Sequence, residues 1–208
     1  MKYKVLITLF FLISSITSFA QQRPRYSIGL DVKIPRITSN SAFKTVMYSI
    51  ADLDANFNYL IAKSVSAGLD IKYAYFQINN KFFQNQINGQ IELNGLGLSL
   101  FYINNTSDIT YVKLGSKIGA YQLLGSLGTD SPLYKELSYI IEPTVGVYLN
   151  NSSFGSVGLL FSYSLWNSSF KPEMIGMTQI SGLNSSNFNA LNRVFCVGLS
   201  YEKVFGYK

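Results

Sequence analysis

The sequence predicts an all-β protein, an eight-stranded antiparallel up-and-down β-barrel, and three observations support this. Eight segments after residue 25 alternate between bulky apolar residues and small or polar residues with period two, as strands with two different faces do. The connections between these segments are alternately long and short. No helical periodicity of comparable length appears in the chain.

The first twenty residues are predicted to be a cleaved signal peptide. Two lysines precede an apolar run at residues 5–16, and small residues follow at Ser18 and Ala20, the two positions that a signal peptidase recognises. The apolar run is shorter than the roughly 20 residues that a spanning helix needs. We therefore expect residues 1–20 to be removed and residues 21–208 to form one barrel domain.

The eight strands follow in order, each with bulky apolar residues on one face and smaller or polar residues on the other. In the first strand, Ile28, Leu30 and Val32 share a face. The second and third strands are separated by only Lys63 and Ser64, which indicates a tight hairpin. The predicted strands are residues 26–34, 52–62, 65–75, 89–102, 111–120, 141–149, 155–163 and 195–202.

The fourth strand carries an irregularity. Ile91 and Leu93 share one face, whereas Leu96 and Leu98 have the other parity. We therefore predict a β-bulge at Gly95 that resets the register of this strand. The long connections are predicted at about residues 35–51, 77–88, 125–137 and 166–192, and the short turns at residues 63–64, 104–107 and 150–153.

The sizes of the side chains on the two faces favour a membrane barrel over a soluble one. One face carries Tyr, Phe, Leu, Ile and Val, which is more volume than the interior of an eight-stranded barrel holds. The other face is rich in glycine and serine, which suit a crowded lumen but form strands poorly. We therefore predict an eight-stranded antiparallel up-and-down transmembrane β-barrel, with a soluble lipocalin-like barrel as the alternative.

Charged side chains are predicted to line the lumen. They make up only 13% of the chain, against roughly 25% in soluble domains, and a charge at the lipid midplane costs about 2–4 kcal/mol. Because buried charges need partners, those on the small-residue face predict a lumen ion-pair network. Its predicted members are Asp31, Lys33, Asp54, Asp70, Lys72, Glu92, Lys113, Lys117 and Glu142.

Aromatic residues gather near strand ends, as at Tyr26, Tyr201 and Phe205, which is typical of interfacial girdles. With its signal peptide and eight alternating segments, the chain resembles the small Gram-negative outer-membrane β-barrels, namely the OmpA-like transmembrane domain and the OmpX group. The terminal aromatics, with Tyr207, resemble the signal recognised by the barrel-assembly machinery, although the last residue is Lys208. The resemblance implies an outer-membrane location, assembly by that machinery and contact with lipopolysaccharide.

The chain offers little for catalysis. It has no histidine, which removes the usual imidazole base and most transition-metal sites, so we predict no enzyme activity and no catalytic residue. Asp52 and Asp54 form a ladder with Asn56 and Asn58 that suits a hard cation, but neighbouring lysines favour ion pairing, so we predict no metal or cofactor. The one cysteine, Cys196, excludes an internal disulfide. The basic residues are scattered, which disfavours nucleic-acid binding.

The last connection is more apolar than a solvated loop, which indicates that it packs or binds. It either folds over the barrel mouth, where Phe43 and Val46 of the first connection offer contacts, or presents a surface to a protein partner or host ligand. The candidate partner-binding residues are Trp166, Phe170, Met174, Ile175, Met177 and Ile180. Candidate contacts to lipopolysaccharide phosphates in the outer loops are Lys44, Lys81, Lys135 and Lys171.

These observations predict a non-enzymatic integral outer-membrane barrel with a structural role, or an adhesion or partner-docking role through its outer loops. Two alternatives stay open on the sequence: a narrow porin-like transport barrel, and a secreted soluble β-barrel that binds a ligand.

Overall fold

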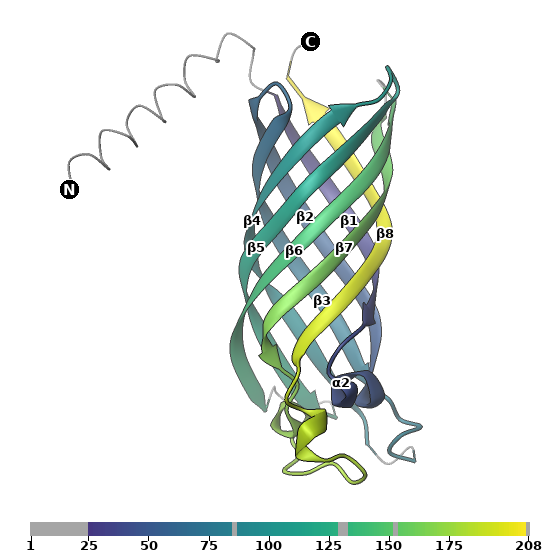
Figure 1. Ribbon diagram of the computed structural model, residues 1–208, viewed down its shortest axis with the longest axis vertical. Helices are drawn as coiled ribbons and strands as arrows, with labels where there is room; N and C mark the ends of the chain where they lie inside the picture. The colour runs from purple at the N-terminus through teal and green to yellow at the C-terminus, as the bar shows by residue number, and fades with distance from the viewer. Residues whose placement is uncertain (1–24, 85–86, 129–132, 152–153, 207–208) are drawn as a thin grey trace, which may run out of the picture.

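The computed structural model describes residues 25–84, 87–128, 133–151 and 154–206, so the predicted signal peptide lies outside the described residues. Eight antiparallel strands close into one barrel, in which each strand pairs with the next and β8 pairs with β1 (Figure 1). The predicted eight-stranded antiparallel up-and-down barrel is therefore confirmed. The strands are β1 (Tyr26–Ile37), β2 (Met47–Ala62), β3 (Val65–Ile78), β4 (Gly89–Asn105), β5 (Thr110–Leu127), β6 (Tyr134–Asn151), β7 (Gly155–Ser169) and β8 (Leu191–Phe205).

The two ends of the barrel differ. One end, called here the loop end, carries the short helical segments α2 (Ser41–Val46), η1 (Pro172–Ile175) and η2 (Ser185–Asn187), and lies at the bottom of Figure 1. The other end, called the turn end, carries the short hairpin connections, the start of β1 and the end of β8. Among the described residues, no helix has the length and apolar character needed to cross a bilayer.

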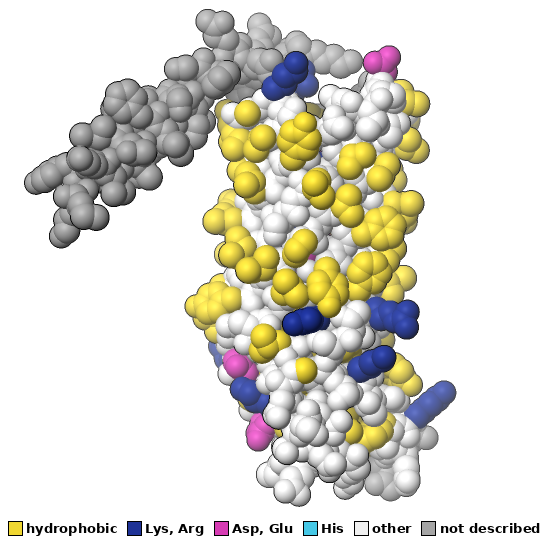
Figure 2. Space-filling model, in the orientation of Figure 1, with side chains coloured by type: hydrophobic (Ala, Val, Ile, Leu, Met, Phe, Trp, Pro, Cys, Tyr) yellow, Lys and Arg dark blue, Asp and Glu magenta, His cyan; other side chains and the backbone are white. Residues whose placement is uncertain are grey.

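Large apolar side chains point outward over the barrel wall. Along β1, Leu30, Val32 and Ile34 are half exposed or more, whereas Asp31 and Lys33 between them are buried. Figure 2 shows aliphatic and aromatic side chains spread over the wall that faces the viewer. The bulky face is therefore the outer one, which is the arrangement of a membrane barrel and the opposite of a lipocalin-like barrel.

The fourth strand has no register reset at Gly95 within its described pairing, and the predicted bulge was wrong. The pairing of β4 with β5 continues one residue at a time from Gly89 to Asn105. Ile91 and Leu93 point into the barrel and are buried, while Leu96 points outward. The change of parity therefore marks a change in what fills the lumen, because near the loop end the apolar side chains of β4 point inward and the polar ones outward.

The same cause explains why β5, β6 and β7 extend farther toward the loop end than predicted. Inward-facing residues in these extensions include large apolar ones, as at Leu123, Ile140 and Trp166, and all three are buried. Where the lumen is apolar, the contrast between the two faces disappears, and with it the alternation that predicts a strand.

Candidate functional site

Charged side chains fill the middle of the barrel, and we call them the lumen cluster. They alternate along their strands, so the period-two geometry of a strand points all of them inward. Asp54 is central, because it lies opposite Asp31 of β1 and opposite Lys72 of β3. The lumen cluster comprises Asp31, Lys33, Asp52, Asp54, Asp70, Lys72, Lys117 and Glu142, all of them buried.

Two lysines of the lumen cluster share one glutamate. The Lys33 Nζ lies 2.7 Å from Asp54 Oδ2 and 2.6 Å from Glu142 Oε1. The Lys72 Nζ lies 2.8 Å from Asp52 Oδ2 and 2.7 Å from Glu142 Oε2. Glu142 therefore bridges strands β1 and β3 from the opposite wall of the barrel, with one carboxylate oxygen on each ammonium group.

Lys117 joins three aspartates. Its Nζ lies 2.6 Å from Asp54 Oδ2, 2.8 Å from Asp70 Oδ1 and 3.1 Å from Asp31 Oδ2. Because all four side chains are shielded from water, the ion pairs offset desolvation costs that none of these groups could bear alone. The ion pairs of the lumen cluster therefore connect five strands across the interior of the barrel.

A smaller polar group lies closer to the turn end. Glu202 accepts hydrogen bonds from Lys113 at 2.9 Å, from the Tyr111 hydroxyl at 2.9 Å and from the Ser27 hydroxyl. The Lys113 Nζ also lies 5.1 Å from the centroid of the Phe101 ring, a cation–π contact. Glu202 is therefore neutralised and fully hydrogen-bonded where it lies.

The structure places eight of the nine predicted lumen residues in these two groups. Glu92 is the exception, and its predicted lumen position was wrong. With an unbroken register through Gly95, Glu92 points outward, where it accepts a hydrogen bond from Gln90 at 2.7 Å. Asp52, for which the sequence favoured ion pairing in a ladder with Asp54, lies in the lumen cluster. Glu202 was missed, although its inward parity in the sequence identifies it.

Apolar side chains close the loop end of the lumen, and we call them the plug. The ring of Phe43 in α2 stacks on Phe170 at 5.4 Å between centroids and packs against Trp166 at 5.9 Å. Aromatic pairs of this kind add about 0.5–1.5 kcal/mol each beyond the burial of their area. The plug includes Ala42, Phe43, Val46, Phe76, Ile91, Leu93, Leu123, Ile140, Trp166, Phe170, Met174, Ile175, Ile180 and Val194.

The plug corrects the prediction of a partner-binding loop. The connection after β7 folds over the barrel mouth and onto α2, which is the other arrangement that the sequence left open. Burial inside the barrel removes this apolar surface from water, so it is not presented to a partner. Five of the six candidate residues are at most 3% exposed, namely Trp166, Phe170, Met174, Ile175 and Ile180. The sixth, Met177, is partly buried and packs against the plug.

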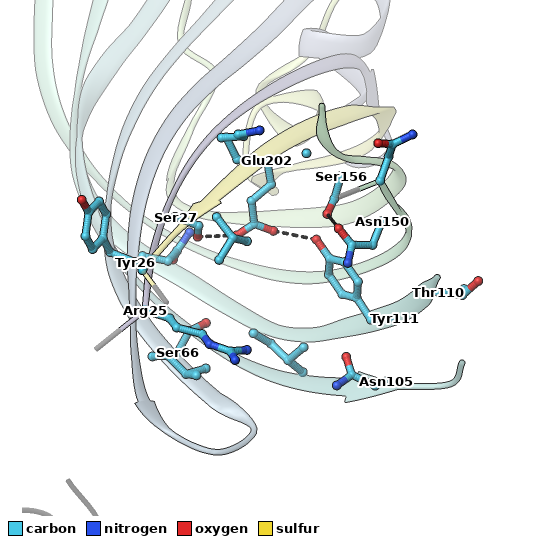
Figure 3. A pocket seen from close by; sticks show the side chains of 18 of the residues that line it. Arg25, Tyr26, Ser27, Ser66, Asn105, Thr110, Tyr111, Asn150, Ser156 and Glu202 are labelled. Carbon is cyan, nitrogen blue, oxygen red and sulfur yellow. Dashed lines mark hydrogen bonds between the residues drawn. The ribbon is translucent and has the colours of Figure 1, made fainter. Parts of the chain in front are cut away.

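Three regions therefore follow one another along the barrel axis: an open basin at the turn end (Figure 3), the lumen cluster, and the plug. Between the basin and the lumen cluster, a space of about 10 Å³ beside Lys113 and Tyr148 has room for about one water molecule. Within the described ranges, no group of three or more carboxylate or thiol side chains has the arrangement of a metal site.

A closed antiparallel barrel with a charged lumen and an apolar wall is the architecture of the small outer-membrane β-barrels, and the predicted resemblance is confirmed at the level of the fold. Among solved structures, Neisserial surface protein A is similar over 85% of this chain and 95% of its own, at 12% sequence identity and a TM-score of 0.55. The attachment invasion locus protein Ail of Yersinia pestis covers 88% of this chain and 100% of its own, at 8% identity and a TM-score of 0.45. No family model matches the chain, and no curated protein matches its sequence.

Proposed function

We propose that the protein is a non-enzymatic integral barrel of the Gram-negative outer membrane that serves the envelope as a structural element and docks partners through its outer loops. The observation that carries the proposal is the direction of the side chains: large apolar groups point outward over the wall, and the charged groups at the same depth are buried in the lumen. An apolar surface of this extent is stable only when it is covered, and lipid acyl chains cover it on all sides.

The edges of the apolar band support this placement. At the turn end, the outward ring of Tyr26 lies 6.0 Å from Phe57 and 5.4 Å from Phe205, an aromatic cluster of the kind found at membrane interfaces. At the loop end, Arg36 and Arg193 point outward from neighbouring strands. Figure 2 shows basic side chains on the loop side of the apolar band.

Lipopolysaccharide is the proposed lipid partner at the loop end. Arg36 and Arg193 are exposed, and a guanidinium group pairs well with phosphate. Lys171, a predicted contact, instead pairs with Glu136 at 3.2 Å. Partial burial acts to lower the pKa of Lys171, but hydrogen bonds to Glu136 and Tyr134 outweigh it and raise this pKa above its ordinary value. Lys44, Lys81 and Lys135 remain proposed contacts.

A docking partner would meet a polar surface at the loop end. The apolar residues of the last connection are used in the plug, whereas Asn184, Ser185 and Ser186 around η2 are exposed. Hydroxyl and amide groups of this kind form adaptable hydrogen bonds to a protein or a glycan. We propose the exposed face around η2 as the docking surface, and we propose assembly into the membrane by the barrel-assembly machinery.

Neither alternative function gains support from the side chains. A soluble ligand binder needs its apolar face inside, and here that face is outside. A porin-like barrel needs a continuous aqueous path, and the lumen cluster and the plug occupy two successive stretches of the tube.

Heat-modifiable gel migration of the membrane fraction tests the proposal. We expect a folded form in the outer membrane that migrates differently with and without boiling, and trypsin added to intact cells should cleave only in the loops at the loop end. A soluble periplasmic pool whose migration does not depend on boiling would contradict the proposal.

A further inference from the structure

A basin opens into the barrel at the turn end, and the proposed function does not use it. Its volume is about 580 Å³, which is within the range of small-molecule sites. Figure 3 shows side chains from the strand ends and hairpins that surround it. Hydroxyl and amide groups predominate in its lining, among them Ser27, Asn58, Ser66, Asn105, Thr110 and Ser156.

The inner wall of the basin contributes no net charge. Glu202 lines it, but this carboxylate is paired with Lys113 at 2.9 Å and accepts hydrogen bonds from Tyr111 and Ser27. A cationic ligand therefore finds no unpaired carboxylate at this depth, because the positive partner of Glu202 is already in place.

The outer part of the basin is cationic. Arg25 and Lys63 line it, and in the described part of the chain neither lies within ion-pair distance of a carboxylate. Lys203 also lines the basin, and the other lining carboxylate is that of Asp108, so three cations face one anion. Figure 3 shows the Arg25 side chain extending from the start of β1 into the basin.

A buried hydroxyl provides a second, independent observation. Ser66 lines the basin and is 3% exposed, and its Oγ has no hydrogen-bond partner among the described residues. A buried hydroxyl without a partner is costly, and such a group is expected to be satisfied by something that occupies the site.

We propose that the basin binds the phosphate group of a phosphomonoester or of a phospholipid headgroup. A phosphomonoester carries about −1.5 to −2 charges and three acceptor oxygens, which match two cations and a hydroxyl donor. The phosphodiester of a lipid headgroup carries one charge and two non-bridging oxygens, which match one guanidinium group and a hydroxyl donor. The neutral hydroxyl and amide groups around the basin bind the polar remainder of the ligand. The site is independent of the proposed envelope function, because the ligand enters from the turn end.

Calorimetric titration with glycerol phosphate tests the site, using the full barrel refolded in a nonionic polyoxyethylene detergent. We expect saturable binding that Arg25→Gln weakens at least about tenfold and that Ser66→Ala weakens roughly fivefold, in line with the loss of a charged and a neutral hydrogen bond. The matched control is Lys171→Gln, an exposed lysine at the loop end that pairs with Glu136, which should bind as the unmodified protein does. Heat-modifiable migration shows that each variant is folded.

Vesicles containing phosphatidylglycerol distinguish the two sources of phosphate. Binding of soluble glycerol phosphate identifies a phosphomonoester site, and binding of only the vesicles, lost in Arg25→Gln, identifies a lipid-headgroup site; both support the proposal. Absence of saturable binding to either probe would overturn it. Equal binding of uncharged glycerol, or an equal loss in Lys171→Gln, would also overturn it.

Discussion

Glu142 shows how much one inward side chain contributes to the lumen. Its two carboxylate oxygens contact Lys33 at 2.6 Å and Lys72 at 2.7 Å, and Ser164 donates a hydrogen bond to it at 2.6 Å. All of these groups are buried. Because both lysines depend on the same carboxylate, loss of its charge leaves two buried ammonium groups with fewer anions than they need.

We predict that Glu142→Gln, which keeps the shape and removes the charge, lowers the free energy of unfolding by about 3–5 kcal/mol. Urea unfolding in lipid vesicles, followed by the fluorescence of Trp166, the one tryptophan of the chain, measures this change. The control is Glu173→Gln at an exposed position of η1, which should stay within about 0.5 kcal/mol of the unmodified protein. Equal midpoints for the two variants would show that the lumen cluster does not stabilise the barrel.

At the scale of the strand, inward glycines make room for inward aromatic rings. A Cβ atom at Gly158 would lie 2.6 Å from the Tyr148 ring and 2.7 Å from the carbonyl oxygen of Val147. The Tyr148 ring stacks on Tyr111 with centroids 4.8 Å apart. The small residues on the inner face of the strands therefore leave space for the few large rings and long charged side chains that extend across the narrow lumen.

The connections at the loop end form an element with its own stability. The helix α2 is capped by Asn40, whose side chain accepts a hydrogen bond from the Phe43 backbone amide at 3.0 Å. The connection after β7 is joined to it by the stack of Phe43 on Phe170. Since these segments contact the wall mainly through the plug, they can loosen while the strands stay paired.

We predict that Phe170→Ala loosens the plug and leaves the barrel intact. Removing a fully buried phenylalanine costs about 3–5 kcal/mol, and here the cost falls on the packing of the loops. Trypsin cleavage after Lys44, which follows Phe43 in α2, should become faster, while heat-modifiable migration is retained. Phe154→Ala, at an exposed position beside a hairpin, is the control and should be cleaved at the unmodified rate. Unchanged cleavage in Phe170→Ala would contradict the plug as a structural unit.

At the scale of the whole molecule, two successive groups of side chains block the lumen of the barrel. Ion-paired side chains fill the middle, and apolar side chains fill the loop end. The open basin reaches only the Glu202 group from the turn end. Two obstructions of different chemistry lie in series, so opening one of them does not open a path through the protein.

We therefore predict no steady ohmic current in planar lipid bilayers, because side chains fill an eight-stranded barrel. Deleting residues 173–189, which removes Met174, Ile175 and Ile180 from the plug, should leave the current unchanged, since the lumen cluster still closes the tube. A steady current through the unmodified protein would contradict the closed lumen. A current that appears only in the deletion variant would show that the lumen cluster does not block ions.

The sequence by itself determined the barrel and the inward direction of most of its charges. A strand places alternate side chains on opposite faces, so parity alone assigns Lys33, Asp54 and Glu142 to one side, and side-chain volume assigns that side to the lumen. Both arguments are local, because each needs only the residues of one strand.

Only the tertiary structure decided what fills the tube at each level along its axis. Phe43 stacks on Phe170 in the plug, and Arg25 and Ser66 line the same basin. Closure of the barrel brings these residues together although they lie far apart in the chain. Where the lumen changes from charged to apolar, the bulky side chains of β4 change from the outward to the inward face. The outward direction of Glu92 followed from that change, which no local pattern shows, because polarity inside the barrel depends on all eight strands at once.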